Sequence, residues 1–150
     1  MSIKFSLQNV LDVRHGKVEL LETEMGKLLS ARQKTDEMLQ SLRREQASLL
    51  GLLHTAQSGE IDLFKISTLR SNILRINERI DDAMLELASL NREIEKKRVE
   101  LISAKQDEET LEILKKKRHE VYLAEQIQIE ARAQDDIYIA RAFRNQQQGA

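Results

Sequence analysis

The chain has 150 residues, contains no proline, cysteine or tryptophan, and consists by half of Ala, Glu, Lys, Leu and Arg. This composition is typical of coiled coils and long helices, and charges in nearly every turn exclude helices buried on all sides. Because the formal net charge is -1, no charge excess indicates nucleic acid or an anionic membrane as a partner.

The first predicted element is a helix over about residues 5–56. Steps of three and four from Leu11 give a mostly apolar series, which predicts a coiled-coil seam. Its positions are Leu11, Arg14, Val18, Leu21, Met25, Leu28, Arg32, Thr35, Leu39, Leu42, Gln46, Leu49, Leu53 and Ala56. The exceptions weaken the seam but could fix its register; they are Arg14, Arg32, Thr35 and Gln46. Three glycines inside this helix are tolerated defects, local soft spots in a rod that must bend, or sites of close helix approach: Gly16, Gly26 and Gly51.

A turn over about residues 57–61 is expected next. Gly59 can adopt the left-handed conformation that ends a helix, and Asp62 is a suitable N-cap for the following one. Because the connection is short, the two helices should be antiparallel neighbours.

The second helix is predicted over about residues 62–145, with a frayed tail over 146–150. Its seam positions are Ile66, Leu69, Ile73, Ile76, Ile80, Ala83, Leu87, Leu90, Ile94, Lys97, Leu101 and Ala104. Beyond Ala104 we expect the phase to slip, because the same frame would place Glu108, Lys115 and Arg118 on the seam. At 1.5 Å per residue the first helix is ~78 Å long and the second ~126 Å, so pairing should end near residue 114. The expected fold is an all-α, antiparallel two-helix coiled-coil hairpin in a single domain.

Both ends of the chain resemble the FliJ family, a stalk-like component of the bacterial flagellar export apparatus. The chain opens with Phe5-Ser-Leu-Gln-Asn-Val-Leu11 and closes its second helix with Glu120-Val-Tyr122 and Glu130-Ala-Arg-Ala-Gln-Asp135-Asp136-Ile137. The family typically begins with a Phe-x-Leu-x-x-Leu-Leu-like segment and ends with an acidic pair before an aliphatic residue. This chain has Asp136 where the family more often has Glu.

The resemblance implies that the end bearing both termini inserts into the central hole of a hexameric export ATPase. It also implies contact with the export-gate membrane protein and with export chaperones. The ATPase-facing residues would be Phe5, Leu7, Leu11, Tyr122, Asp135, Asp136 and Ile137. The related stalk of an injectisome-type secretion system would look the same in sequence.

Three surfaces are candidates for partner binding. Near the turn, extra apolar residues either close the tip over itself or form an exposed patch for a partner: Leu50, Leu52, Leu63, Phe64 and Leu74. The end of the second helix either pairs with a second copy or inserts into a partner, through Leu111, Leu114, Val121, Ala124, Gln128 and Ala131, flanked by Tyr122, Ile127, Ile129, Ile137 and Ile139. The basic run forms a collar, either solvated or docked on an acidic ring: Lys115, Lys116, Lys117 and Arg118.

No enzymatic signature accompanies these surfaces. His15, His54 and His119 stand alone, no Gly-rich phosphate loop is present, and carboxylate pairs on a solvated helix have no pocket to shift their pKa values. We therefore expect no catalytic, cofactor or metal site. The hypothesis is a cytoplasmic export stalk that is peripheral to the membrane through its partners, with neither nucleic-acid binding nor direct membrane insertion. The alternative is a self-assembling scaffold with no ATPase partner.

Overall fold

A computed structural model describes residues 5–149, and within this range all regular structure is helical. Helix α1 spans Gln8–Ala56 and the longer helix α2 spans Leu63–Gln148. The all-α prediction and the relative lengths are confirmed. Helix α1 begins three residues later than expected, and α2 remains helical through 146–148, where fraying was predicted. Residue 150 of that tail lies outside the described range.

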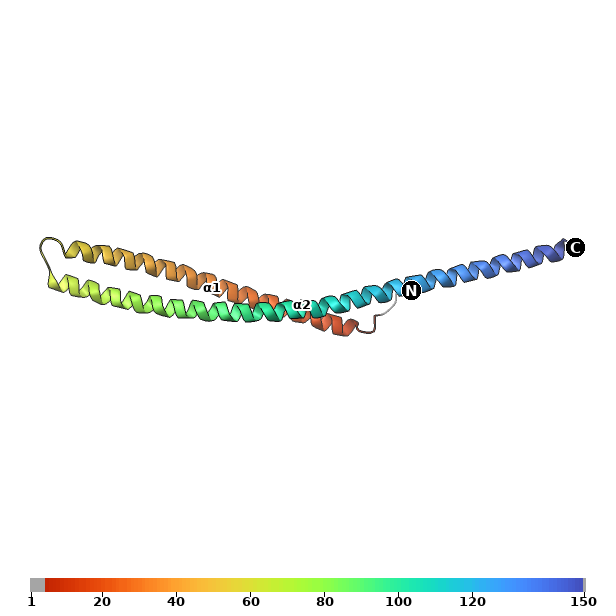
Figure 1. The fold of residues 1–150 in the computed structure, drawn as a ribbon, viewed down its shortest axis with the longest axis horizontal. Helices are drawn as coiled ribbons and strands as arrows, with labels where there is room; N and C mark the ends of the chain where they lie inside the picture. Colours follow the sequence, from red (N-terminus) through yellow and green to blue (C-terminus); the bar gives the residue numbers. More distant parts are fainter. Residues whose placement is uncertain (1–4, 150) are drawn as a thin grey trace. The chain divides into compact units, whose positions relative to one another are not determined.

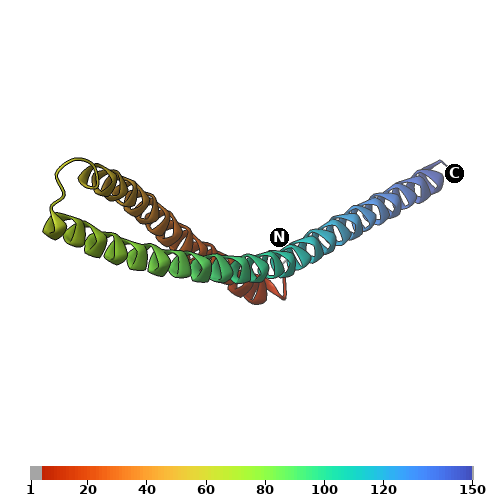
Figure 2. The ribbon, with the colours of Figure 1, turned by 60° about the vertical axis from the view of Figure 1, so that its left-hand side comes forward.

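The chain divides into two compact units. The hairpin unit is Glu19–Ser103, and the terminal unit combines the chain up to Val18 with the chain from Ala104 onward. In the hairpin unit α1 and α2 run side by side in opposite directions and are joined by the turn at one end (Figures 1 and 2).

The turn between the helices uses the predicted residues. Gly59 has a φ of 78°, the left-handed conformation that glycine adopts without a steric cost. Asp62 caps α2, because its Oδ1 accepts hydrogen bonds from the backbone N–H groups of Phe64 at 3.0 Å and Lys65 at 3.3 Å. These bonds satisfy two of the backbone donors that every helix start leaves unpaired.

The predicted seam supplies the core of each unit. Every position of the first heptad series except Arg32 is buried or partly buried, as is every position of the second series. A central cluster consists of Leu39, Leu42, Ile76, Ile80 and Ala83, with Leu49 and Leu87 packed against it. Burying such an aliphatic side chain contributes on the order of 1.5–3 kcal/mol, so this cluster is a main source of stability for the pair of helices.

Polar residues in and beside the seam pair across it. Gln46 Nε2 donates to Asn77 Oδ1 at 2.6 Å, and Lys97 Nζ donates to Glu24 Oε2 at 2.7 Å. Thr35 is buried at 5% exposure. As the residue number rises on α1, that of its partner on α2 falls by nearly the same step, which is the register of an uninterrupted antiparallel pair.

In the terminal unit the heptad frame continues past Ala104, where a slip was predicted, and ends near residue 114, where pairing was expected to end. Glu108 is partly buried, and its Oε1 lies 2.7 Å from His15 Nδ1, while Leu111 is buried at 7% exposure. The heptad frame therefore holds through Leu111, and the predicted slip beyond Ala104 is wrong. The imidazole of His15 accommodates the carboxylate that appeared incompatible with the seam. Lys115 is exposed, so the frame ends between Leu111 and Lys115.

The glycines inside α1 are not sites of close helix approach. A Cβ atom added at Gly16, Gly26 or Gly51 would meet nothing within 4 Å. Of the three interpretations that the sequence leaves open, close helix approach is therefore wrong.

Candidate functional site

The tip of the hairpin unit carries an exposed apolar patch. Leu50 is 48% exposed and Leu74 is 64% exposed, and Leu63 and Phe64 are exposed to a still greater extent. These side chains do not close the tip over itself, because they remain exposed. Leu50 and Leu74 lie off the seam, and Leu63 and Phe64 precede the first seam position on α2. We call this surface the tip patch; its residues are Leu50, Leu52, Ile61, Leu63, Phe64 and Leu74.

Ile61 belongs to the tip patch but was not predicted from the sequence. It is 60% exposed and lies in the turn, outside both heptad series. Its signal in the sequence was a branched apolar residue in an otherwise polar turn between Gly59 and Asp62. Such a residue has no seam to enter, so it adds to the exposed apolar surface.

Four of the predicted ATPase-facing residues lie where the terminal unit is still paired. Leu11 is buried in the seam, whereas Phe5, Leu7 and Tyr122 are partly buried. Arg118 links these segments, because its guanidinium carbon lies 5.4 Å from the centroid of the Phe5 ring and its Nη1 donates to Ser6 Oγ at 2.7 Å. The remaining side-chain surface available to a partner here comes from Phe5, Leu7 and Tyr122.

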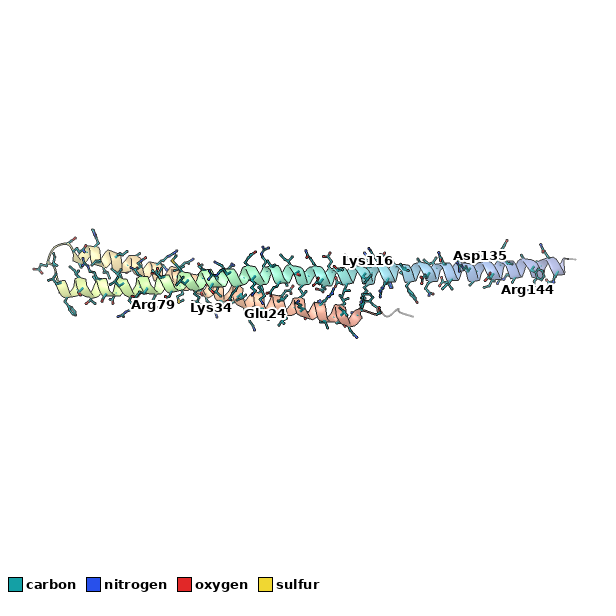
Figure 3. All side chains as sticks on the ribbon, turned by 60° about the horizontal axis from the view of Figure 1, so that its bottom comes forward. Glu24, Lys34, Arg79, Lys116, Asp135 and Arg144 are labelled. Carbon is teal, nitrogen blue, oxygen red and sulfur yellow. The ribbon has the colours of Figure 1, made fainter. Side chains whose placement is uncertain are left out.

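The other three predicted residues lie on a different surface. Asp135, Asp136 and Ile137 are exposed and begin 13 residues after Tyr122, about 20 Å farther along α2. Figure 3 shows the side chains of Asp135 and Arg144 on this part of the helix. The seven predicted residues therefore do not form one continuous patch.

No other described residue covers the last part of α2. Every residue from Ile127 to Gly149 is exposed, and we call this range the bare segment. Its large apolar side chains are Ile127, Ile129, Ile137, Tyr138, Ile139 and Phe143, with exposures from 53% to 74%. Tyr138 and Phe143 were missed in the sequence analysis, because neither falls on the loose face that was followed there. Of that face, Leu111 is buried and Leu114 is partly buried, whereas Val121 is exposed.

The apolar residues of the bare segment do not form a single stripe. Successive residues of an α-helix point about 100° apart, so Ile137, Tyr138 and Ile139 point in three different directions. The other apolar residues fill the directions between them. A coiled-coil partner covers only one stripe of a helix, so this distribution is not that of an ordinary two-helix seam.

The basic collar contains two kinds of residue. Lys115, Lys116 and Lys117 are exposed and make no ion pair within residues 5–149. Arg118 is bound to Phe5 and Ser6 within the chain.

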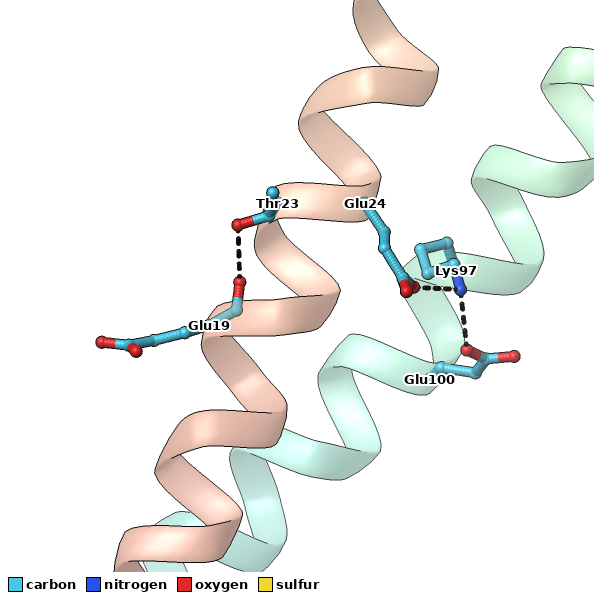
Figure 4. A network of polar contacts seen from close by, with 5 residues as sticks. All are labelled: Glu19, Thr23, Glu24, Lys97 and Glu100. Carbon is cyan, nitrogen blue, oxygen red and sulfur yellow. Dashed lines mark hydrogen bonds and ion pairs between the residues drawn. The ribbon is translucent and has the colours of Figure 1, made fainter.

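The clearest shifts in pKa come from ion pairs on the helix surfaces. The hydrogen bond from Lys97 to Glu24 is the main cause that raises the pKa of Lys97, and Glu100 adds to it at 3.4 Å (Figure 4). Arg98 donates hydrogen bonds to Glu95 and thereby lowers the pKa of that carboxyl. Both shifts arise from these local ion pairs and require no pocket for substrate.

Two further findings concern other kinds of site. Among the residues that the structure describes, no group of three or more His, Asp or Glu side chains could hold a metal ion. A search of the same range finds no helix with an apolar stretch long enough to cross a bilayer.

Comparison with known proteins identifies the family. The model of the family described as Flagellar FliJ protein matches residues 3–148, nearly the whole chain. Neither a curated protein nor a solved structure matches the chain. The matched range includes α1, the turn and α2 as far as Gln148. The chain therefore belongs to the FliJ family, whose members are components of the flagellar export apparatus.

Proposed function

We propose that this protein is the stalk of the flagellar type III export apparatus and that its bare segment inserts into the central hole of a hexameric export ATPase. Insertion would promote assembly of the hexamer and couple it to the membrane export gate. The observation that carries the proposal is that the apolar residues of the bare segment lie around the whole circumference of α2.

The large apolar side chains of the bare segment point in directions all around the helix, so a partner that covers all of them has to enclose it. Pairing with one other helix would cover one stripe and leave Ile137, Tyr138 or Ile139 in water. A ring of subunits around the helix would cover every direction at once. Charged residues between the apolar ones, including Arg132, Asp135 and Arg141, would supply polar contacts to the ring.

Phe5, Leu7 and Tyr122 would then lie at the mouth of the ring. They are partly buried within the chain, and the part of each side chain that remains exposed could pack against the ATPase. Leu11 would act only by supporting this region from the seam.

The tip patch supports a second binding surface. Its six apolar residues have no cover within the described chain, and an exposed patch of this kind marks an interaction site. We assign it to the export-gate membrane protein, with export chaperones as further ligands. Neither nucleic acid nor direct membrane insertion is part of the proposal.

The competing function is a scaffold that self-assembles through the bare segment. A helix dimer would require an apolar stripe with three- and four-residue spacing, such as the one that pairs α1 with α2. The bare segment has one series of this spacing, Ile129, Ala133, Ile137, Ala140 and Phe143. Burying that series against a second helix would leave Ile127, Tyr138 and Ile139 exposed, which favours an enclosing partner.

Light scattering on the purified chain, alone and with the export ATPase of the same cell and a non-hydrolysable nucleotide, tests the proposal. We expect a monomer alone and a hexamer carrying one copy of the chain in the mixture. The variant Ile137→Asp/Ile139→Asp should lose this effect, whereas the control Leu20→Asp/Leu85→Asp, which changes two exposed residues of the hairpin unit, should retain it. A stable dimer that leaves the ATPase unassembled would support the scaffold and contradict the stalk.

A further inference from the structure

Within the described chain, the three lysines of the basic collar make no ion pair, whereas its fourth residue, Arg118, has partners. Lys115, Lys116 and Lys117 are exposed, and no carboxylate of residues 5–149 lies within ion-pair distance of them. Arg118 holds Phe5 and Ser6 instead. The three ammonium groups are therefore available to an anionic partner.

The lysines point in different directions around α2. At about 100° per residue, Lys115 to Lys117 span about 200° of the circumference, and Arg118 covers the side where the start of the chain lies. A flat or one-sided partner could reach only part of this arc. The lysines together therefore suit a partner that curves around the helix.

The collar also lies where such a partner would have to stop. Arg118 contacts Phe5 and Ser6 at the start of the chain, and the bare segment begins at Ile127, about 15 Å beyond Lys117. A ring enclosing the bare segment would meet the thicker, paired part of the terminal unit at this level. Long lysine side chains extend from the helix and could reach carboxylates on the rim of the ring.

We propose that Lys115, Lys116 and Lys117 bind a circle of carboxylates at the mouth of the ring and so set the depth of insertion. This inference rests on the proposed function, because it requires a ring around the bare segment. Nucleic acid is the other polyanion to consider. A duplex passes along one side of a helix and would engage a stripe of cations, whereas these lysines lie at one level and around it.

The test compares Lys115→Gln/Lys116→Gln/Lys117→Gln with a control that has the same change in net charge, Lys27→Gln/Lys34→Gln/Lys96→Gln. All six lysines are exposed, and glutamine is a good helix former, so both variants should fold. Affinity for the nucleotide-bound ATPase hexamer is measured as a function of NaCl concentration. Binding to a 20-nucleotide single strand and to a 20-base-pair duplex is measured in the same buffer.

We expect the collar variant to raise the Kd for the hexamer about tenfold at low salt and to flatten its dependence on salt, because cation–carboxylate contacts are screened. The control should change the Kd less than twofold. If the unmodified chain binds the hexamer and the collar variant behaves like the control, the collar inference is wrong and insertion stands. Loss of nucleic-acid binding by the collar variant, with hexamer binding unchanged, would overturn it in favour of a nucleic-acid site. Failure of the unmodified chain to bind the hexamer would instead reject the proposed function.

Discussion

The guanidinium carbon of Arg118 lies 5.4 Å from the centroid of the Phe5 ring, and the same side chain donates a hydrogen bond to Ser6. The contact joins residues that are more than one hundred positions apart and ties the start of the chain to α2. Arg118 therefore differs from the neighbouring lysines of the collar, because its side chain already has partners within the chain.

Arg118→Gln should loosen the start of the chain without unfolding the helices. A cation–π contact at an exposed site is worth about 0.5–1 kcal/mol, so we expect a several-fold faster amide exchange over residues 7–12 and a melting temperature within about 2 °C of the unmodified chain. Arg144→Gln, an exposed position in the bare segment, is the control. Unchanged exchange over residues 7–12 would show that the contact does not hold this segment.

Alanine at Gly16, Gly26 and Gly51 should stabilise the chain. A Cβ atom at each position meets nothing within 4 Å, and alanine is favoured over glycine inside a helix by about 1 kcal/mol. Each single variant should therefore raise the urea midpoint of unfolding. A lower midpoint would mean that α1 needs flexibility at that residue to pack against α2.

Lys97 makes the stability of the hairpin unit sensitive to alkaline pH. Its pKa is raised above 10.5, mainly by the hydrogen bond to Glu24, so the stabilising contribution is fully present below pH 10.5 and is lost as the pH rises through the raised value. Lys97→Leu makes this seam position apolar and removes the titration. Between about pH 9 and pH 12, the range in which lysines titrate, the melting temperature of the unmodified chain should fall by more than that of the variant. Equal losses in both proteins would show that Lys97 is not responsible.

Lysine at Leu50 and Leu74 should weaken binding at the tip without affecting the fold. Both leucines are exposed and off the seam, so surface substitution should change the free energy of unfolding by no more than about 0.5 kcal/mol. Affinity for the cytoplasmic domain of the export-gate protein should fall at least about tenfold, because two charges would enter an apolar contact. Ala47→Lys/Ser71→Lys, two exposed positions nearby, is the matched control. Equal affinity of the two variants would show that the tip patch does not bind the export-gate protein.

Much of the fold follows from periodicity alone. The steps of three and four from Leu11 and from Ile66 predict nearly all the residues that the seam buries, and Gly59 and Asp62 mark the turn. Periodicity describes the face of one helix and does not reveal which residue lies opposite. The pairing of Glu108 with His15, which keeps the frame intact through Leu111, was therefore not predictable.

The candidate site was predictable only in part. The tip leucines and the lysines of the collar were identified from their residue types, but their exposure depends on where the partner helix lies. The link between Arg118 and Phe5 depends on the register of pairing across the whole chain. The distribution of apolar residues around the bare segment was present in the sequence and was missed because a single face was sought.

The most direct test of the central claim is the protection of one full turn of the bare segment. The chain has no cysteine, so single cysteines can be placed at Asp136, Ile137, Tyr138 and Ile139, with Ser30→Cys in the hairpin unit as the control. Maleimide labelling is followed by mass spectrometry with and without the nucleotide-bound ATPase hexamer. An enclosing ring predicts that all four positions lose at least about tenfold in labelling rate while Ser30→Cys is unaffected, because the four directions cover the circumference of the helix. If one of the four positions keeps its full rate in a saturated complex, the bare segment lies in a one-sided groove and the stalk account is contradicted.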